Sequence, residues 1–197
     1  MAYEELKSSG ITENTPKNIA FGAGTIHKGF KFTENAWNFA ESLIGATQGG
    51  SKFTITPEVT DIEADGALVK VERLRVKTGE TATMEVNFLE VTPEILKMVT
   101  IGKSGTATNV TGYDEITSKA RLEAGDYVEN LAYVGKTIEG TPIIVIFDKA
   151  ICTSGLELEG KNKENGIIKA TFECVAPLTG DLETLPWHIY YPTPISG

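Results

Sequence analysis

Apolar and polar residues alternate with a period of two along residues 51–60. The apolar set is Phe53, Ile55, Pro57 and Val59, and the polar set is Thr54, Thr56, Glu58 and Thr60. This alternation predicts a strand with one face buried and the other facing water. Because proline lacks an N–H group, Pro57 indicates an edge strand or a bulge.

The same alternation continues beyond this strand. Asp65-Gly66 predicts a hairpin turn, residues 67–77 a return strand, and residues 78–80 a second turn. A third strand follows, with Ala82, Met84, Val86 and Phe88 on one face and Thr83, Glu85 and Asn87 on the other. Further strands are predicted at residues 127–134, 142–151, 155–159, 167–176 and 187–191.

One helix is predicted near residues 92–101. Thr92 is the expected N-cap, Pro93 occupies the first helical position, and Glu94 lies at the positive end of the helix dipole. Its apolar residues are Ile95, Leu96, Met98 and Val99, and Gly102 ends it.

Two segments lack a clear pattern. Residues 1–18 are polar and turn-rich, which predicts an arm that is ordered by a partner surface. Residues 35–44 are compatible with a short helix or a loop, closed by Gly45 and by Gly49-Gly50. The sequence therefore predicts a mainly β fold, a sandwich or barrel of two packed antiparallel sheets with one short flanking helix. We expect one domain over residues 1–197, with an N-terminal arm at about 1–18.

Charge argues against a nucleic-acid-binding protein. The chain has 27 acidic and 18 basic residues and a formal net charge of -9, which repels phosphate. Arg73, Arg75 and Lys77 are expected on one face of a strand, where a solvated or salt-bridged face is favoured over phosphate contacts. Cys152 and Cys174 are too few for a disulfide framework. We expect two small core residues in a reducing compartment, with one bridge between neighbouring strands as the alternative.

Catalytic and metal-binding patterns are absent from the sequence. His27 and His188 are its only histidines, and neither has a Cys or carboxylate at ligand spacing. Gly22-Ala23-Gly24 lacks the third glycine of a dinucleotide-binding motif. Asp148, Glu157 and Glu159 are the candidates for an acid–base pair, but Glu157 and Glu159 alternate with Leu156 and Leu158, as on an ordinary strand with one wet face. We predict no enzymatic activity, no catalytic or metal site and no cofactor. No signal peptide or run of about 18 apolar residues is present, so we expect no membrane contact.

Several short sequence segments, taken in their order along the chain, resemble those of one protein family. Residues 43–53 (LIGATQGGSKF) are similar to the LGATKGG motif of tail tube proteins from phages and prophages of Gram-positive hosts. Residues 58–67 (EVTDIEADGA), 71–76 (VERLRV) and 89–94 (LEVTPE) are similar to the strand, turn, return strand and helix start that follow. Residues 24–30, 126–130 and 185–191 extend the resemblance over about residues 20–192. The chain thus resembles major tail tube proteins, within the superfamily that also includes type VI tubes.

The resemblance implies a structural role in a virion tail assembled in the host bacterial cytoplasm. Six copies would form a ring, and stacked rings a tube that conducts DNA. The partners implied are other copies of the chain, the tape-measure protein, the tail terminator, baseplate or tail-tip proteins and, transiently and non-specifically, DNA in the lumen. Lumen-facing candidates are Thr54, Thr56, Glu58, Thr60, Arg73 and Arg75, and subunit-interface candidates are Trp37, Phe39, Gly49 and Gly50. The alternatives are a tube of a contractile phage-tail-like injection particle and a monomeric β-sandwich binding module, for example one that binds carbohydrate.

Overall fold

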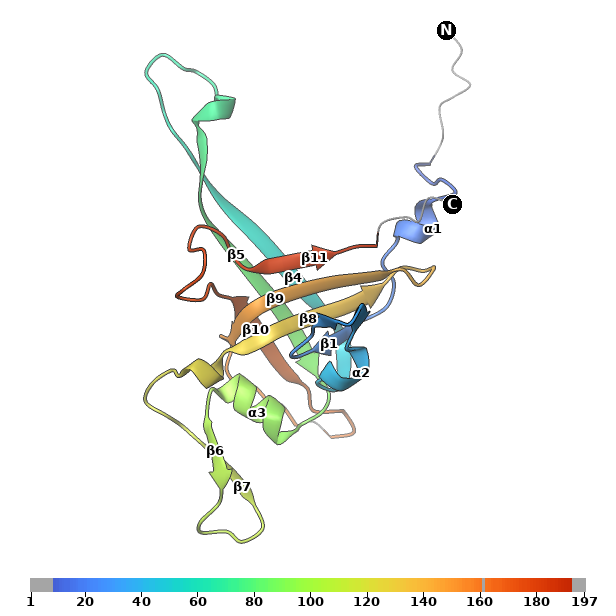
Figure 1. Cartoon of the computed structure of the whole chain (residues 1–197), viewed down its shortest axis with the longest axis vertical. Coiled ribbons are helices and arrows are strands. Elements are labelled where there is room, and N and C mark those ends of the chain that lie inside the picture. Colours follow the sequence, from blue (N-terminus) through green and yellow to red (C-terminus); the bar gives the residue numbers. More distant parts are fainter. Residues whose placement is uncertain (1–8, 161, 193–197) are drawn as a thin grey trace.

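The computed structural model describes residues 9–160 and 162–192 and is mainly β (Figure 1). The helices are α1 (Thr15–Asn18), α2 (Phe39–Ser42) and α3 (Pro93–Thr100), with 3-10 turns at Glu72–Leu74 and Ala124–Asp126. The strands are β1 (Thr25–His27), β2 (Phe32–Thr33), β3 (Ala36–Trp37), β4 (Thr47–Asp61), β5 (Arg75–Phe88), β6 (Lys103–Thr106), β7 (Asp114–Thr117), β8 (Val128–Lys136), β9 (Pro142–Cys152), β10 (Ile168–Cys174) and β11 (Trp187–Tyr190).

Seven strands form one antiparallel sheet that divides at β9. Its order is β1-β8-β9-β10-β5-β4, and β11 pairs with β9 outside this path. Along its second edge, β9 pairs first with β11 and then, at Ala150, Ile151 and Cys152, with β10. The predicted mainly β fold with a flanking helix is confirmed. The two layers are not separate sheets, however, because the ladder through β9 and β10 connects them.

The main core lies between the β4–β5–β10 layer and the β8–β9 layer. Met84 and Phe88 on β5 and Phe147 on β9 have no exposed surface, and the Phe53 and Tyr133 rings meet between β4 and β8 with centroids 6.1 Å apart. A second cluster covers the outer face of β8 and β9. Its buried members are Phe30, Ala132, Ile144 and Ile146.

Helix α3 forms where it was predicted. The side chain of Thr92 accepts a hydrogen bond from the Ile95 N–H at 3.2 Å, Pro93 begins the helix, and Ile95, Met98 and Val99 are buried. The helix ends at Thr100, and its C-cap is Ile101, which has a left-handed backbone conformation, one residue before the predicted Gly102. No helix in residues 9–160 or 162–192 is long and apolar enough to cross a membrane.

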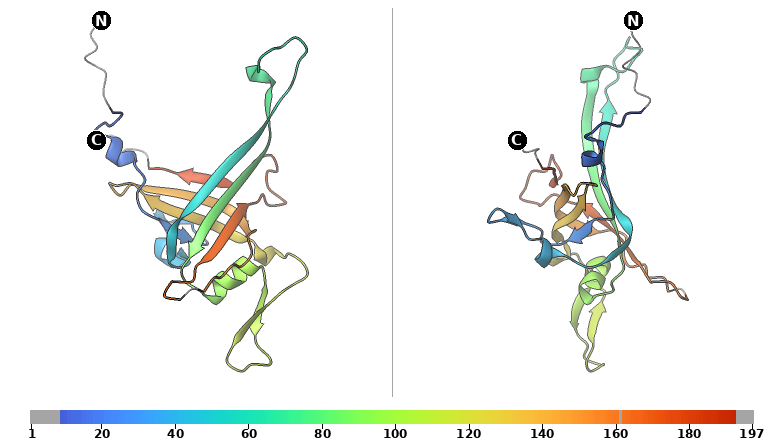
Figure 2. Two further views of the ribbon diagram at one scale, coloured as in Figure 1. Left: turned by 180° about the vertical axis from the view of Figure 1, so that it is seen from behind. Right: turned by 90° about the vertical axis from the view of Figure 1, so that its right-hand side faces the viewer.

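Strands β4 and β5 form one long hairpin that extends beyond the rest of the molecule (Figure 2). Two predictions are wrong here. Residues 67–74 belong to the loop between the strands, because the return strand begins only at Arg75. Residues 78–80 do not form a turn, because β5 continues through them to Phe88. The register shift in the pairing of β5 with β4 at this point is a β-bulge. The partner of Glu58 is Gly79 and that of Val59 is Lys77, so Thr78 is the extra residue. Pro57 does lie on an edge strand, as predicted.

Other segments differ from the sequence-based expectations. Residues 155–159 form no strand and contribute only an isolated bridge between Leu158 and Ile168. Residues 35–44 contain both β3 and α2. The hairpin β6–β7, in a Gly- and Thr-rich region, was not predicted. Of the predicted N-terminal arm, residues 1–8 lie outside the described residues, and residues 9–18 are mostly exposed. Cys152 and Cys174 are buried and unbridged, which excludes the predicted alternative of a disulfide.

Candidate functional site

A broad polar surface covers the outer face of the β4–β5–β10 layer. Thr54, Thr56, Glu58 and Thr60 are all exposed on β4, and the alternation of a strand puts them on one face. Directly opposite residues share a face, so the pairs Thr54–Thr83 and Thr83–Glu173 carry this surface across β5 to β10. The residues added by β5 and β10 are Thr81, Thr83, Glu85, Asn87, Lys169, Thr171 and Glu173.

This threonine-rich face carries a small negative excess. Its charged residues are Lys52, Glu58, Glu85, Lys169 and Glu173. The ammonium of Lys52 lies 3.1 Å from the carboxylate of Glu85, an exposed pair. The carboxylate of Glu58 lies over Gly79, the residue opposite it. The face is therefore hydroxyl-rich, with two lysines against three glutamates, and offers phosphate little to bind.

Two candidates for the same surface lie elsewhere. Arg73 is in the 3-10 turn at Glu72–Leu74 rather than on a strand. Arg75 is opposite Asp61, and alternation along β4 puts this pair on the other face from Glu58 and Thr60. The prediction that Arg73, Arg75 and Lys77 share one strand face is wrong, because β5 begins only after Arg73.

These cations pair with carboxylates of the hairpin. Arg75 Nε donates to Asp61 Oδ1 at 2.6 Å, and Lys70 Nζ lies 2.7 Å from Asp61 Oδ2. The hydrogen bond from Lys70, assisted by Arg75, lowers the pKa of Asp61. Lys77 pairs with Glu80, whose other oxygen accepts the indole N–H of Trp187 at 2.9 Å. The expected salt-bridged state of this basic stripe is thus confirmed for Arg75 and Lys77.

The edge of the sheet beside this face is unpaired. β4 is the last strand of the sheet, so the backbone along its outer side has no partner strand in the described chain. β10 pairs with β5 only from Thr83 to Phe88, so residues 75–82 of β5 form a second free edge. The hairpin beyond the body therefore presents unpaired backbone on both sides, a geometry that favours pairing with another chain.

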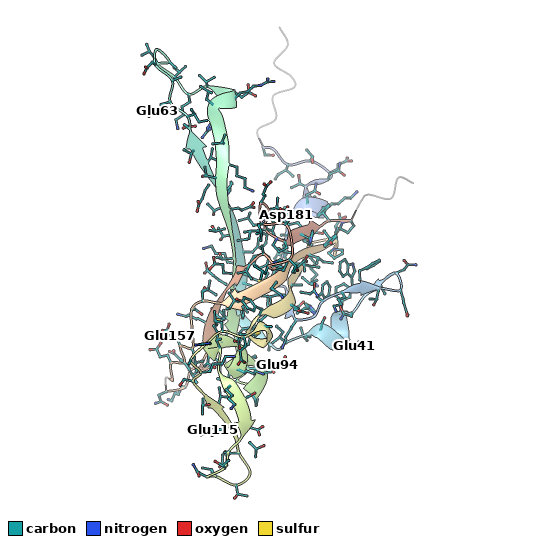
Figure 3. All side chains as sticks on the ribbon, turned by 60° about the vertical axis from the view of Figure 1, so that its left-hand side comes forward. Glu41, Glu63, Glu94, Glu115, Glu157 and Asp181 are labelled. Carbon is teal, nitrogen blue, oxygen red and sulfur yellow. The ribbon has the colours of Figure 1, made fainter. Side chains whose placement is uncertain are left out.

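The loop at the end of this hairpin is apolar and exposed. Leu68 is 98% and Val69 77% exposed, and Ile62 and Val71 are about half exposed. Figure 3 shows Glu63 of this loop and Glu115 of the β6–β7 hairpin at opposite ends of the molecule. Val110 and Tyr113, between β6 and β7, are also exposed apolar residues. Both projecting ends thus carry apolar side chains with no intrachain cover.

The subunit-interface candidates divide into two groups. Trp37 stacks on Phe30 with ring centroids 4.9 Å apart, and Phe39 packs against Phe30 at 5.4 Å, so both rings take part in an intrachain cluster. Gly49 and Gly50 lie in β4 with φ angles of 83° and 82°, at an irregularity in the pairing with β5. Only the glycines belong to the free edge strand.

Two titratable residues of the described chain, His27 and Cys174, are buried. His27 is buried, with Nδ1 2.9 Å from Ser42 Oγ and Nε2 2.8 Å from Thr25 Oγ1, and burial lowers its pKa. Burial and nearby carboxylates raise the pKa of the Cys174 thiol to about 12, which makes it a poor nucleophile. No group of three or more His, Cys, Asp or Glu within residues 9–160 and 162–192 is arranged to hold a metal ion.

Sequence reasoning found the β4 part of the polar face but not its full width. Alternation in residues 82–88 already predicted outward positions for Thr83 and Glu85. The addition of Lys169, Thr171 and Glu173 depends on pairing between strands about 85 residues apart in the chain, which no local pattern specifies.

A comparison with solved structures finds distant likenesses. No family model and no curated protein matches the chain. The fold is similar to a chain of the virion of a native gene transfer agent particle, with 10% sequence identity and a TM-score of 0.40, over 79% of this chain and 92% of that one. A likeness this distant carries no argument about function, which has to be inferred from the residues of the chain itself.

Proposed function

We propose that this chain is a structural, self-assembling subunit, the major tail tube protein of a phage or prophage. Six copies close into a ring, and stacked rings form a hollow tube that conducts DNA. The tape-measure protein, the tail terminator and baseplate or tail-tip proteins are its partners in the virion tail. The sequence resemblance over about residues 20–192 suggests this role.

The observation that carries the proposal is the free edge of β4. A monomer with a 15-residue edge strand exposes a row of unpaired backbone groups, which is an aggregation hazard. Closure of a ring removes this edge, because each β4 then pairs with a strand of the next copy. The exposed apolar loops at the two ends of the molecule support stacking of one ring on the next, since such patches are buried in assemblies.

The threonine-rich face is the proposed lumen wall. Hydroxyl groups keep such a wall hydrated, and the excess of glutamate over lysine opposes adhesion of DNA. Arg75 and Lys77 do not alter this wall, because they lie on the other face and are paired. Thr54, Thr56, Glu58 and Thr60 therefore remain the proposed lumen residues, whereas Arg73 and Arg75 do not.

The edge can be blocked without loss of the β4–β5 ladder. Proline in a sheet is tolerated where its nitrogen points away from the partner strand, so Pro57 indicates that odd-numbered residues of β4 direct their N–H groups outward. Val59 is such a residue and is about half exposed. Val59→Pro removes one outward donor, and Val59→Ala removes only the side chain.

Circular dichroism and sedimentation velocity test this pair of variants. We expect both to fold, Val59→Ala to form rings or tubes like the wild type, and Val59→Pro to remain monomeric. Assembly of Val59→Pro at the wild-type concentration would overturn the edge-pairing proposal.

A further inference from the structure

A shallow aromatic groove lies on the opposite side of the molecule from the threonine-rich face. Along β9, Val145 and Phe147 point into the main core, whereas Ile144 and Ile146 lie on the other face with the second cluster. The β2–β3 hairpin stands out beside this second face (Figure 2). Between the hairpin and β11 is a cavity of about 440 Å³, lined by Phe30, Lys31, Phe32, Thr33, Trp37, Asn130, Ile146, Asp148, His188 and Tyr190.

Three aromatic rings frame this groove. Trp37 stacks on the buried Phe30, which fixes its orientation. Phe32 and Tyr190 both contact Trp37, with ring centroids 5.0 and 5.3 Å away. Phe32 is 54% and Tyr190 44% exposed, so both rings keep surface for a ligand. The rings are held by intrachain packing and need no rearrangement to present that surface.

Polar groups with unused hydrogen-bonding capacity surround the rings. Within the described chain, neither the Trp37 indole N–H nor the Asn130 side-chain amide has a hydrogen-bond partner. His188 Nε2 lies 3.3 Å from Asp148 Oδ2, so this pair is pre-positioned at the rim. Lys31 and Asp148 balance each other in charge, which favours an uncharged ligand over a nucleic acid or an acidic peptide.

We propose that this groove binds a neutral pyranose saccharide. The C–H faces of a pyranose pack on aromatic rings through the hydrophobic effect and dispersion. Its hydroxyls need donors and acceptors when they leave water, and the indole, amide, imidazole and carboxylate groups supply them. The volume lies within the range of known ligand pockets, about 300–1,000 Å³. In a tube lined by the threonine-rich face, the groove faces outward, but saccharide binding does not depend on assembly.

The two tryptophans allow a test with an internal control. In a ¹⁵N-labelled monomer at low concentration, the indole N–H signals of Trp37 and Trp187 are followed by NMR during titration with maltopentaose, cellopentaose or chitopentaose. We expect at least one pentasaccharide to shift the Trp37 signal saturably, with a dissociation constant of about 1 mM or tighter. The Trp187 signal stays fixed, because its N–H is bonded to Glu80.

Two variants locate the binding. Tyr190→Ala weakens it about tenfold or more, as expected for an aromatic ring at the centre of a contact. Tyr113→Ala removes a 67% exposed tyrosine between β6 and β7, outside the groove, and leaves saccharide binding unchanged. The proposal is overturned if no pentasaccharide moves the Trp37 signal at about 10 mM, or if Tyr190→Ala binds as the wild type does. Loss of tube assembly by Tyr190→Ala would instead assign the groove to contact between copies, and would leave the tube proposal intact.

Discussion

Replacement of Glu58 by lysine tests the proposed lumen wall. Glu58 is exposed, lies over Gly79 and has no ion-pair partner in the described chain, so the substitution should change stability by less than about 0.5 kcal/mol. It reverses the balance of the threonine-rich face from two lysines and three glutamates to three lysines and two glutamates. The variant should therefore fold as the wild type does, while the net charge of the proposed lumen wall changes from negative to positive.

The size of the effect follows from sixfold repetition. A ring of six gains about six phosphate-binding ammonium groups and changes by about twelve charges relative to the wild type. If all six contact DNA, its affinity for the tube should fall by roughly a thousandfold between 50 and 200 mM salt. Wild-type tubes should show no comparable affinity.

The assay compares DNA release from particles that carry either form, by fluorescence of a DNA dye at low and high salt. We expect Glu58→Lys tubes to assemble, to release DNA slowly at low salt and to recover at high salt. Glu139→Lys, at an exposed position in the turn between β8 and β9 and outside the threonine-rich face, is the matched control and should behave as the wild type. Unchanged release by Glu58→Lys would refute the lumen position, and failed assembly would assign Glu58 to a subunit interface.

Three further predictions concern stability and reactivity. Phe172→Ala removes a fully buried ring in edge-to-face contact with Phe88 and should lower the free energy of unfolding in urea by about 3–5 kcal/mol. The same change at the exposed Phe21 should lower it by less than about 0.5 kcal/mol. Equal urea midpoints for the two variants would contradict the assigned core. Burial and nearby carboxylates raise the pKa of the Cys174 thiol to about 12. In the folded protein at about pH 8 this thiol should not react with a thiol reagent, whereas in urea it should, as followed by mass spectrometry. Rapid labelling of Cys174 in the folded protein would disprove its burial. Burial lowers the pKa of His27, so as the pH falls the unfolded chain takes up a proton on this residue before the folded chain does, and the free energy of unfolding should decrease below about pH 6.5. The urea midpoint of His27→Gln should therefore decrease less between about pH 7 and 5 than that of the wild type. An equal decrease in both proteins would argue against this linkage.

Local patterns in the sequence predicted those elements whose signals are local. The Thr92-Pro93-Glu94 helix start depends on groups within one turn, and it forms as expected. The alternation of Ala82, Met84, Val86 and Phe88 predicted one shared face for the same reason, and all four residues are completely buried. Pro57 indicated an edge strand or a bulge because it has no N–H to donate within a sheet, and it lies on the edge strand β4.

The remaining features depend on pairing between distant segments. Gly79 indicated a turn, but pairing with β4 extends β5 through it and leaves a bulge. Phe53 and Val59 were expected on a buried face, yet they are 39% and 48% exposed. Phe53 contacts Tyr133 but lies on the edge strand, and Val59 lies where the hairpin extends beyond the pairing of β5 with β10. The aromatic groove joins β2–β3 to β11, about 150 residues later, and no local pattern predicts that contact.

Electron cryomicroscopy of the purified protein at high concentration tests whether the chain forms a tail tube. We expect hollow tubes of stacked sixfold rings, in which β4 pairs with a strand of the next copy and the face with Thr54, Thr56 and Glu58 lines the channel. Compact monomers at every concentration and salt, or tubes with this face on the outside, would contradict this expectation.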